Sequence, residues 1–119
     1  MNSANKHNYC HEFSYPTSAG NKAIKKETEN RFTVLLKHGT MSIEYFAPQK
    51  IDLQKPHSQD EIYVIASGSG LFFRDGERIQ FSQGDVLFVP AGMDHHFENF
   101  SKDFATWVIF YGADGGETE

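Results

Sequence analysis

His95 is the side chain whose position points most directly to chemistry. The apolar run Val86–Val89 ends at a corner made by Pro90 and Gly92, which a regular strand cannot cross. Side chains alternate in the strand that follows, so His95 shares a face with Phe97 and points into an apolar interior. An interior imidazole needs a polar partner, and a metal ion is a common one. His95 is therefore a candidate metal ligand.

His57 and Glu61 form a second group with the same potential. Glu61 stands directly before the apolar run 62–65, where an unpaired buried carboxylate would be costly and a divalent cation would remove that cost. His57 precedes it in a polar segment. Two other interpretations stay open. Glu61 caps the strand at the surface while His57 is solvated, or Asp60 replaces Glu61 after a slip in register.

Two spaced motifs contain these residues. The segment 84–99 fits the pattern G(x)5PxG(x)2H(x)3N at all of its fixed positions, which are Gly84, Pro90, Gly92, His95 and Asn99. A second pattern, G(x)5HxH(x)3,4E(x)6G, is matched in part, with His57, Glu61 and Gly68 in place but Gln49 and Lys55 at the opening glycine and first histidine. On these motifs the chain resembles a small single-domain cupin over about residues 31–112.

The resemblance implies a metal site made of His57, Glu61 and His95. Two imidazoles and one carboxylate are the ligand set of the facial triad for Fe(II), and the set also suits Mn, Ni or Zn. Gln59 is the candidate for a fourth ligand through its carbonyl oxygen, or for a donor to substrate, or it is an exposed loop residue. Lys55 cannot ligate a metal while protonated. It either anchors a substrate carboxylate or is solvated.

The elements that must position these residues are short strands. Turn residues separate eight β-type segments with no long helix among them, and a weaker pattern predicts one short helix over 23–29. This indicates an all-β fold, and the resemblance implies a double-stranded β-helix jelly-roll barrel. We expect a polar, partly flexible N-terminal arm at 1–30 and a flexible tail at 113–119. The predicted strands are 32–37, 41–46, 61–67, 71–74, 78–81, 86–89, 95–98 and 104–111.

Alternation also predicts which aromatic side chains form a substrate pocket. Met41, Ile43 and Tyr45 alternate with polar residues, so we expect this set to face the barrel interior. Tyr63 and Phe97 share faces with the candidate ligands. The predicted pocket walls are therefore Tyr45, Tyr63 and Phe97. The segment 104–111 is apolar on both faces, and the sequence leaves open which face Trp107 occupies.

Size and composition narrow the class of protein. The 119 residues suit one domain, and 11 Lys and Arg against 16 Asp and Glu, with no block of like charge, predict no nucleic-acid partner. The first residues lack the apolar core of a signal peptide and no run is long enough to span a membrane, so we expect a cytoplasmic protein without membrane association. His96 is interpreted as a surface residue. Cys10, His7 and His11 lack the spacing of a closed zinc site.

The leading functional hypothesis is a divalent-metal-binding cupin that binds or transforms a small organic acid or phenol, with dioxygenase-type chemistry as the first activity considered. The alternative is a non-catalytic cupin that binds a metabolite or metal. A third reading is an empty structural barrel, with Glu61 exposed and His95 bonded to a backbone carbonyl. We also expect a homodimer, because the strand 61–67 is apolar on both faces and the outward Ile62 and Val64 need cover.

Overall fold

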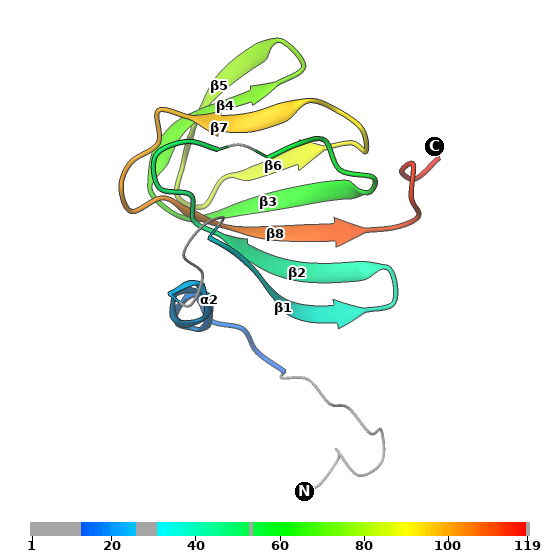
Figure 1. Cartoon of the computed structure of the whole chain (residues 1–119), viewed down its shortest axis with the longest axis horizontal. Helices are drawn as coiled ribbons and strands as arrows, with labels where there is room; N and C mark the ends of the chain where they lie inside the picture. Colours follow the sequence, from blue (N-terminus) through cyan, green and yellow to red (C-terminus); the bar gives the residue numbers. More distant parts are fainter. Residues whose placement is uncertain (1–12, 26–30, 53, 119) are drawn as a thin grey trace, which may run out of the picture.

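Two antiparallel sheets and one short helix make up the fold (Figure 1). The computed structural model describes residues 13–25, 31–52 and 54–118. The larger sheet has the strand order β1-β2-β8-β3-β6 and the smaller sheet the order β5-β4-β7. The elements are α2 (Thr17–Ile24), β1 (Phe32–His38), β2 (Met41–Phe46), β3 (Asp60–Ser67), β4 (Ser69–Arg74), β5 (Glu77–Ser82), β6 (Val86–Val89), β7 (His95–Glu98) and β8 (Ala105–Tyr111).

All eight predicted strands are confirmed, and the all-β class with them, but the helix lies elsewhere. The predicted helix 23–29 shares only its first two residues with α2, and residues 26–30 lie outside the described part of the chain. Pro16 precedes α2 and its carbonyl accepts the N–H of Ala19 at 2.9 Å. The position of α2 follows from tertiary packing, because Gly20 and Ile24 are buried against the larger sheet.

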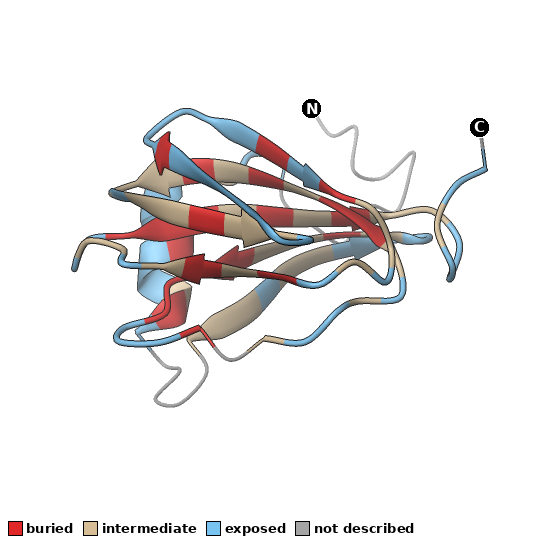
Figure 2. Ribbon diagram, turned by 90° about the horizontal axis from the view of Figure 1, so that it is seen from above, coloured by how far each residue is buried: buried red, intermediate tan, exposed pale blue. Residues whose placement is uncertain are grey.

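Cross-strand register separates the two faces of the larger sheet. Paired residues point to the same side, and the partners of Glu61 are Phe110 on β8 and Val89 on β6. Two residues farther along β3, Tyr63 pairs with Val108. This is the inner face, turned toward the smaller sheet. Figure 2 shows the resulting alternation of buried and less buried residues along the strands.

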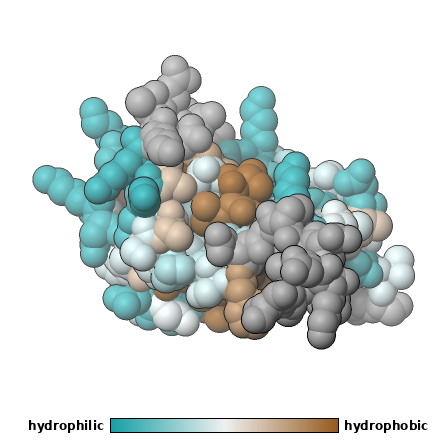
Figure 3. Space-filling view, turned by 90° about the horizontal axis from the view of Figure 1, so that it is seen from below, coloured by the Kyte–Doolittle hydropathy of each residue, from teal (hydrophilic) through white to brown (hydrophobic). Residues whose placement is uncertain are grey.

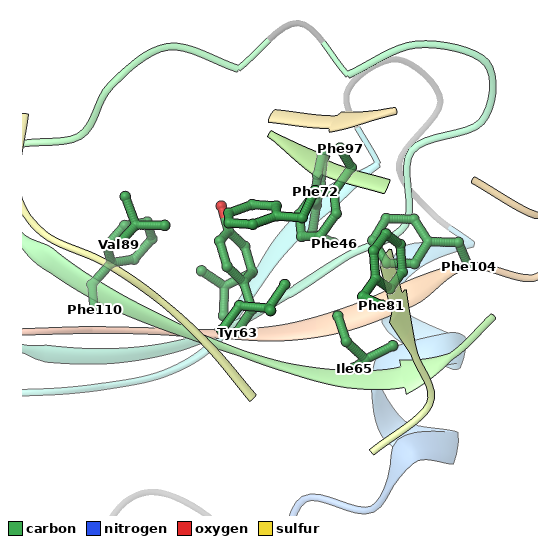
Figure 4. Close-up of a cluster of buried hydrophobic side chains, with 11 residues drawn as sticks. Phe46, Tyr63, Ile65, Phe72, Phe81, Val89, Phe97, Phe104 and Phe110 are labelled. Atoms are coloured by element: carbon green, nitrogen blue, oxygen red, sulfur yellow. The ribbon is translucent and has the colours of Figure 1, made fainter. Parts of the chain in front are cut away.

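The main core fills the space between the two sheets. Tyr63 projects from β3 among aromatic rings of both sheets (Figure 4), with its ring centroid 4.9 Å from that of Phe97 and 5.7 Å from that of Phe72. Both Tyr63 and Phe97 are almost fully buried. The core holds a series of edge-on and tilted aromatic contacts, which fix ring positions beyond simple area burial. Its buried members also include Phe46, Ile65, Phe81, Leu87, Val89, Phe104, Val108 and Phe110.

A second, smaller cluster lies on the outer face of the larger sheet, where α2 packs against β1 and β2. Tyr45 belongs to it, with its ring 4.8 Å from Trp107 in an edge-on contact. Gly20 makes the close approach of α2 possible, because a Cβ there would lie 2.5 Å from the Tyr45 ring. Trp107 is therefore on the outer face, and the predicted orientation of Met41, Ile43 and Tyr45 toward the interior is wrong.

The C-terminal segment, predicted to be flexible, is attached to the start of β3 and to the loop before it. Asp60 accepts the backbone N–H of Glu117 at 2.8 Å, and the Ser58 hydroxyl donates to Asp114 at 3.0 Å.

Several large apolar side chains are exposed, among them Val86 and Phe88 on β6. Figure 3 shows apolar atoms gathered between polar ones on one face of the molecule. No helix among the described residues is long and apolar enough to cross a membrane.

Candidate metal centre and its cavity

The three predicted ligands come from three different parts of the fold and meet at one end of the sandwich. Glu61 lies at the start of β3, His95 begins β7 on the facing sheet, and His57 precedes β3 in a loop. The loop is tied to the corner before β7, because the N–H of Gly92 donates to the His57 carbonyl at 2.8 Å. Gly92 has φ +80°, a conformation that glycine tolerates readily. The corner therefore positions both histidines.

Their ligand atoms gather around one point. His95 Nε2 lies 2.9 Å from Glu61 Oε1, and His57 Nε2 lies 3.9 Å from the same oxygen. One ligand atom from each of the three residues lies within 4.8 Å of the others. Atoms bound at about 2.1 Å to a common ion are typically separated by about 3 to 4 Å. Glu61 and His95 are 0% exposed, so solvent does not satisfy them.

The protonation state of His95 makes the contact with Glu61 informative. The ring Nδ1 lies 2.8 Å from the Met93 carbonyl, which fixes Nδ1 as the N–H donor. In the neutral ring, Nε2 then offers a lone pair toward a carboxylate that also offers lone pairs. Both oxygens of Glu61 and Nε2 of His95 are buried without a hydrogen-bond partner among the described residues. A cation between them satisfies all three atoms, so the residues present fit a divalent metal.

Electrostatics favours positive charge between His95 and Glu61. Burial would lower the pKa of His95, but the nearby Glu61 carboxylate and the Met93 carbonyl outweigh it, so the pKa is raised. Burial lowers the pKa of the half-buried His57, whose ring packs edge-on against Phe110 at 4.9 Å. His57 is therefore held toward its neutral form, which is the form that ligates metals.

A polar network that the sequence did not reveal supports the same end of the cavity. Gln54 places its carbonyl oxygen 3.2 Å from His57 Nε2, and the Tyr63 hydroxyl donates to this oxygen at 3.1 Å. The Gln54 amide donates to Asp52 at 2.6 Å, and Asp52 also accepts the N–H of Phe97 at 2.9 Å. Asp52 is buried. Gln54 therefore contacts one of the candidate ligands directly, and it is the residue before Lys55, which occupies the first histidine position of the motif.

A cavity of about 850 Å³ opens beside His57. Phe32, Phe46 and Phe110 supply its apolar wall, and Glu44 is its half-buried carboxylate. Burial raises the pKa of Glu44 in spite of the hydrogen bond that the Ser42 hydroxyl donates at 2.7 Å. This volume is within the range of small-molecule sites. Sequence reasoning assigned Glu44 to the outside because it alternates with apolar residues.

Comparison with known proteins settles the family. A family profile described as the cupin domain matches residues 42–111, which is more than half of the chain and includes all three candidate ligands. The chain belongs to the cupin family. An uncharacterised protein of Streptomyces coelicolor is 33% identical to this cupin over 91 residues, covering 75% of this chain and 87% of the relative.

Two further similarities are narrower. The acireductone dioxygenase of Ixodes scapularis is 43% identical to this cupin over 61 residues, which cover 44% of this chain and 33% of that enzyme. A solved Cupin 2 conserved barrel domain protein from Salinispora arenicola aligns with a TM-score of 0.60 at 22% identity, over 73% of this chain and 79% of that one. The second similarity concerns the fold alone, and the first spans one third of the dioxygenase.

Three other candidates of the sequence do not belong to the group of His57, Glu61 and His95. Gln59 donates its amide to the carbonyls of Thr40 and Gly112 at 2.7 and 2.9 Å, so it links loops. Asp60 accepts the N–H groups of Ala91 and Glu117, which lower the pKa of its carboxyl. Both side chains are thus occupied by backbone groups. Lys55 is exposed and lines the cavity.

The remaining candidates divide between the two faces of the sheet. Tyr63 and Phe97 lie in the core between the sheets, and neither is among the residues that line the cavity. Tyr45 lies on the opposite face of the larger sheet, under α2. The predicted role of Tyr45 as a pocket wall is therefore wrong. His96 faces away from His95 and lies 2.6 Å from Glu98. His7, Cys10 and His11 lie outside the described residues.

Proposed function

We propose that this cupin binds one divalent metal ion, Fe, Mn, Ni or Zn, through His57, Glu61 and His95 and acts on a small organic molecule in the adjoining cavity. The observation that carries the proposal is the set of buried, unpartnered acceptor atoms on Glu61 and His95. Leaving such atoms unsatisfied is destabilising, and a bound cation satisfies them together. The ion would supply Lewis-acid or redox chemistry to a substrate held beside it.

The chain's own residues have definable roles in such a reaction. Asp52 accepts a hydrogen bond from Gln54 and so holds it in place. Gln54, which also accepts from the Tyr63 hydroxyl, would orient the His57 ring. Glu44 is a half-buried carboxylate with a raised pKa, suited to hold or accept a proton from a substrate hydroxyl. The phenyl rings of Phe46 and Phe110 exclude water from the apolar part of the cavity. The proposed reaction class is dioxygenase-type oxidation of an organic acid or phenol, and the partial similarity to an acireductone dioxygenase supports it.

Oxygen uptake by the loaded protein tests the catalytic part of the proposal. The purified chain is loaded with Fe(II) without oxygen, and oxygen consumption is then measured with a panel of phenols and keto acids. We expect substrate-dependent uptake by the native protein and by His96→Ala, and loss of uptake in His95→Ala. The two variants remove neighbouring imidazoles, only one of which faces the centre. Bound iron without uptake for any member of the panel would favour the non-catalytic alternative.

The empty structural barrel agrees less well with the site. This interpretation requires a hydrogen bond between His95 and a backbone carbonyl, and His95 makes one to the Met93 carbonyl. The same bond is compatible with the proposed metal centre. The empty structural barrel also requires Glu61 to be exposed, but Glu61 is 0% exposed. A non-catalytic cupin that binds a metabolite or metal stays the second candidate, because Lys55 replaces a histidine of the first motif and removes one ligand.

We further propose a homodimer formed through the outer face of the larger sheet. Ile62 and Val64 lie there on β3, and the neighbouring β6 exposes Val86 and Phe88, 65% and 46% exposed. Covering these side chains would bury apolar area without disturbing the cavity. Light scattering at micromolar concentration should give twice the 13.5 kDa chain mass. The monomer mass would contradict the dimer.

A cytoplasmic location stays a prediction, which cell fractionation tests.

A further inference from the structure

The cavity has a second end that the candidate metal centre does not explain. Three residues of the inner face line the cavity in order along the strand direction of the larger sheet. Phe110 lies level with Glu61, Glu44 lies two residues farther along β2 than the partner of Phe110, and Phe46 lies two residues beyond Glu44. Phe32, the first residue of β1, pairs with Phe46 on β2. Arg31 precedes Phe32 and therefore lies beyond Phe46. The cavity therefore extends from His57 of the candidate metal centre past the Glu44 carboxylate and an apolar stretch to the guanidinium of Arg31.

Arg31 is held firmly at that far end. Its Nε–H donates to the Ala47 carbonyl at 2.8 Å, and the Ala47 N–H donates to the Arg31 carbonyl at 2.9 Å. Its φ of +52° is uncommon for a residue with a side chain, and such strain gathers at ligand-binding positions. Among the described residues, no carboxylate forms an ion pair with Arg31. The two terminal nitrogens of the guanidinium thus remain available to donate hydrogen bonds to a ligand. Their planar, forked arrangement suits a carboxylate.

The charges around the cavity favour an anion. The chain carries a formal charge of −5, yet three cations, Arg31, Lys50 and Lys55, line this cavity. Asp52, a lining carboxylate, already accepts three hydrogen bonds from within the protein. Grouped like charges at a cleft raise the local concentration of a ligand of opposite charge.

The middle of the cavity limits the ligand to one charge. The rings of Phe32 and Phe46 pack at a tilt with their centroids 5.1 Å apart, and they form an apolar wall suited to a ring or alkyl body. Glu44 stands between this wall and the metal centre, with one oxygen bonded to Ser42. The other oxygen can accept a hydrogen bond from a hydroxyl, whereas it would repel a second carboxylate.

We propose that the cavity selects a monoanionic organic acid that carries a hydroxyl or keto oxygen at its opposite end. The carboxylate binds Arg31, the body packs on Phe32 and Phe46, and the oxygen faces Glu44 and the metal centre. This inference rests on the proposed function for the metal end only. The anion end depends on protein groups alone and is testable without metal.

Two probes of nearly equal shape test the anion end. Calorimetry compares 4-hydroxyphenylacetate with its neutral amide, 4-hydroxyphenylacetamide, on native protein with and without zinc. We expect the carboxylate to bind about tenfold more tightly than the amide in both states, as a charge-assisted pair warrants. Equal affinity of the two probes, or no binding of either at millimolar concentration, would overturn the inference.

Matched variants assign the preference to Arg31. Arg31→Gln should lower the preference for the carboxylate to about twofold or less, with the affinity for the amide unchanged. Lys102→Gln removes the same charge at an exposed position outside the cavity and should leave the preference intact. An unchanged preference in Arg31→Gln contradicts the assignment. If Arg31→Gln fails to fold, Arg31→Lys, which keeps the charge but loses the fork, should show a reduced preference, and an undiminished one contradicts it.

Metal analysis of the same samples separates this inference from the proposed function. Preference for the carboxylate in a protein that takes up no metal would support the anion site and contradict the metal centre. Metal uptake with no preference between the probes would do the reverse.

Discussion

Two fully buried tyrosines on opposite faces of one sheet illustrate how this cupin separates structure from chemistry. Tyr45 on β2 lies under α2, where its hydroxyl donates to Asn21 at 2.8 Å and burial raises its pKa. Tyr63 on β3 lies on the inner face, where its hydroxyl donates to Gln54. Burial, followed by the nearby Glu61 and Asp52 carboxylates, raises the pKa of Tyr63 well above its usual value.

The difference lies in what each hydroxyl completes. The Tyr45 hydroxyl donates to Asn21, an exposed residue of the helix, so water can hydrogen-bond Asn21 when the hydroxyl is removed. The Tyr63 hydroxyl reaches an amide that also contacts His57 and Asp52, inside a network next to the candidate metal centre. The outer face therefore contributes packing, and the inner face contributes positioned polar groups. Variants on each face test this division.

Removal of the Tyr45 ring should give the largest loss of stability. Tyr45→Ala empties the cluster that joins α2 to the sheet, and truncations of this size cost about 3 to 5 kcal/mol in free energy of unfolding. Urea unfolding measures the loss. Zinc uptake per folded chain should stay unchanged, since Tyr45 faces away from the centre. A matching loss of zinc binding by the folded variant would break the proposed separation of the faces.

Overfilling the same contact should have a smaller effect. In Gly20→Val the new Cβ would meet the Tyr45 ring at 2.5 Å, so the helix must shift, at a cost of about 1 to 3 kcal/mol. Ser18→Val places the same residue on an exposed position of α2 and serves as the control. Thermal unfolding should separate the two variants. Equal melting temperatures would show that α2 is not held by this contact.

Removal of one hydroxyl from each tyrosine sharpens the comparison. Tyr63→Phe leaves a buried network short of a donor and should cost about 1 kcal/mol, whereas Tyr45→Phe should cost less. Tyr63→Phe should also weaken zinc affinity about tenfold, as the loss of a group that orients ligands does. Zinc titration of both variants measures this. Equal zinc affinities would remove Tyr63 from the site.

The smallest effect is expected on the solvent side of the smaller sheet. Arg78 and His96 contact Glu98 at 2.7 and 2.6 Å, and hydrogen bonds from Arg78 and then His96 lower the pKa of Glu98 from 4.5 to about 2. The lowered pKa means that this stabilisation is present above about pH 4.5 and is lost as the pH falls toward 2. In Glu98→Gln, stability should fall less steeply over that range. If the free energy of unfolding of the two proteins had the same dependence on pH over this range, the lowered pKa of Glu98 would be contradicted.

The sequence predicted the strands and the inward His95 well because local signals agree there. Pro90 and Gly92 mark the corner, and the alternation of His95 and Phe97 with polar neighbours points them inward. The same reasoning failed on β2. Alternation treats polar residues as solvent-facing, but Glu44 lines a cavity and Tyr45 is covered by a helix. Tertiary packing reversed the pattern.

The polar network was beyond reach of sequence reasoning for a different reason. Asp52 and Gln54 lie in the long connection between β2 and β3, whose described residues, 47–52 and 54–59, form no helix or strand. Their partners, Phe97 and Tyr63, lie on β7 and β3. No spacing rule connects residues that meet only when a loop folds over a sandwich. The adjacent Lys55 gave one signal, because a motif that lacks its first histidine leaves a position for another polar side chain.

Metal stoichiometry tests the central claim most directly. Protein is purified without chelator, dialysed against zinc and measured for metal content per chain in the native form, His95→Ala and His96→Ala. We predict about one ion per native chain, as a single site implies, the same value for His96→Ala, and a large loss for His95→Ala. Unchanged metal content in His95→Ala, or no metal in the native protein, would contradict the metal centre at His57, Glu61 and His95.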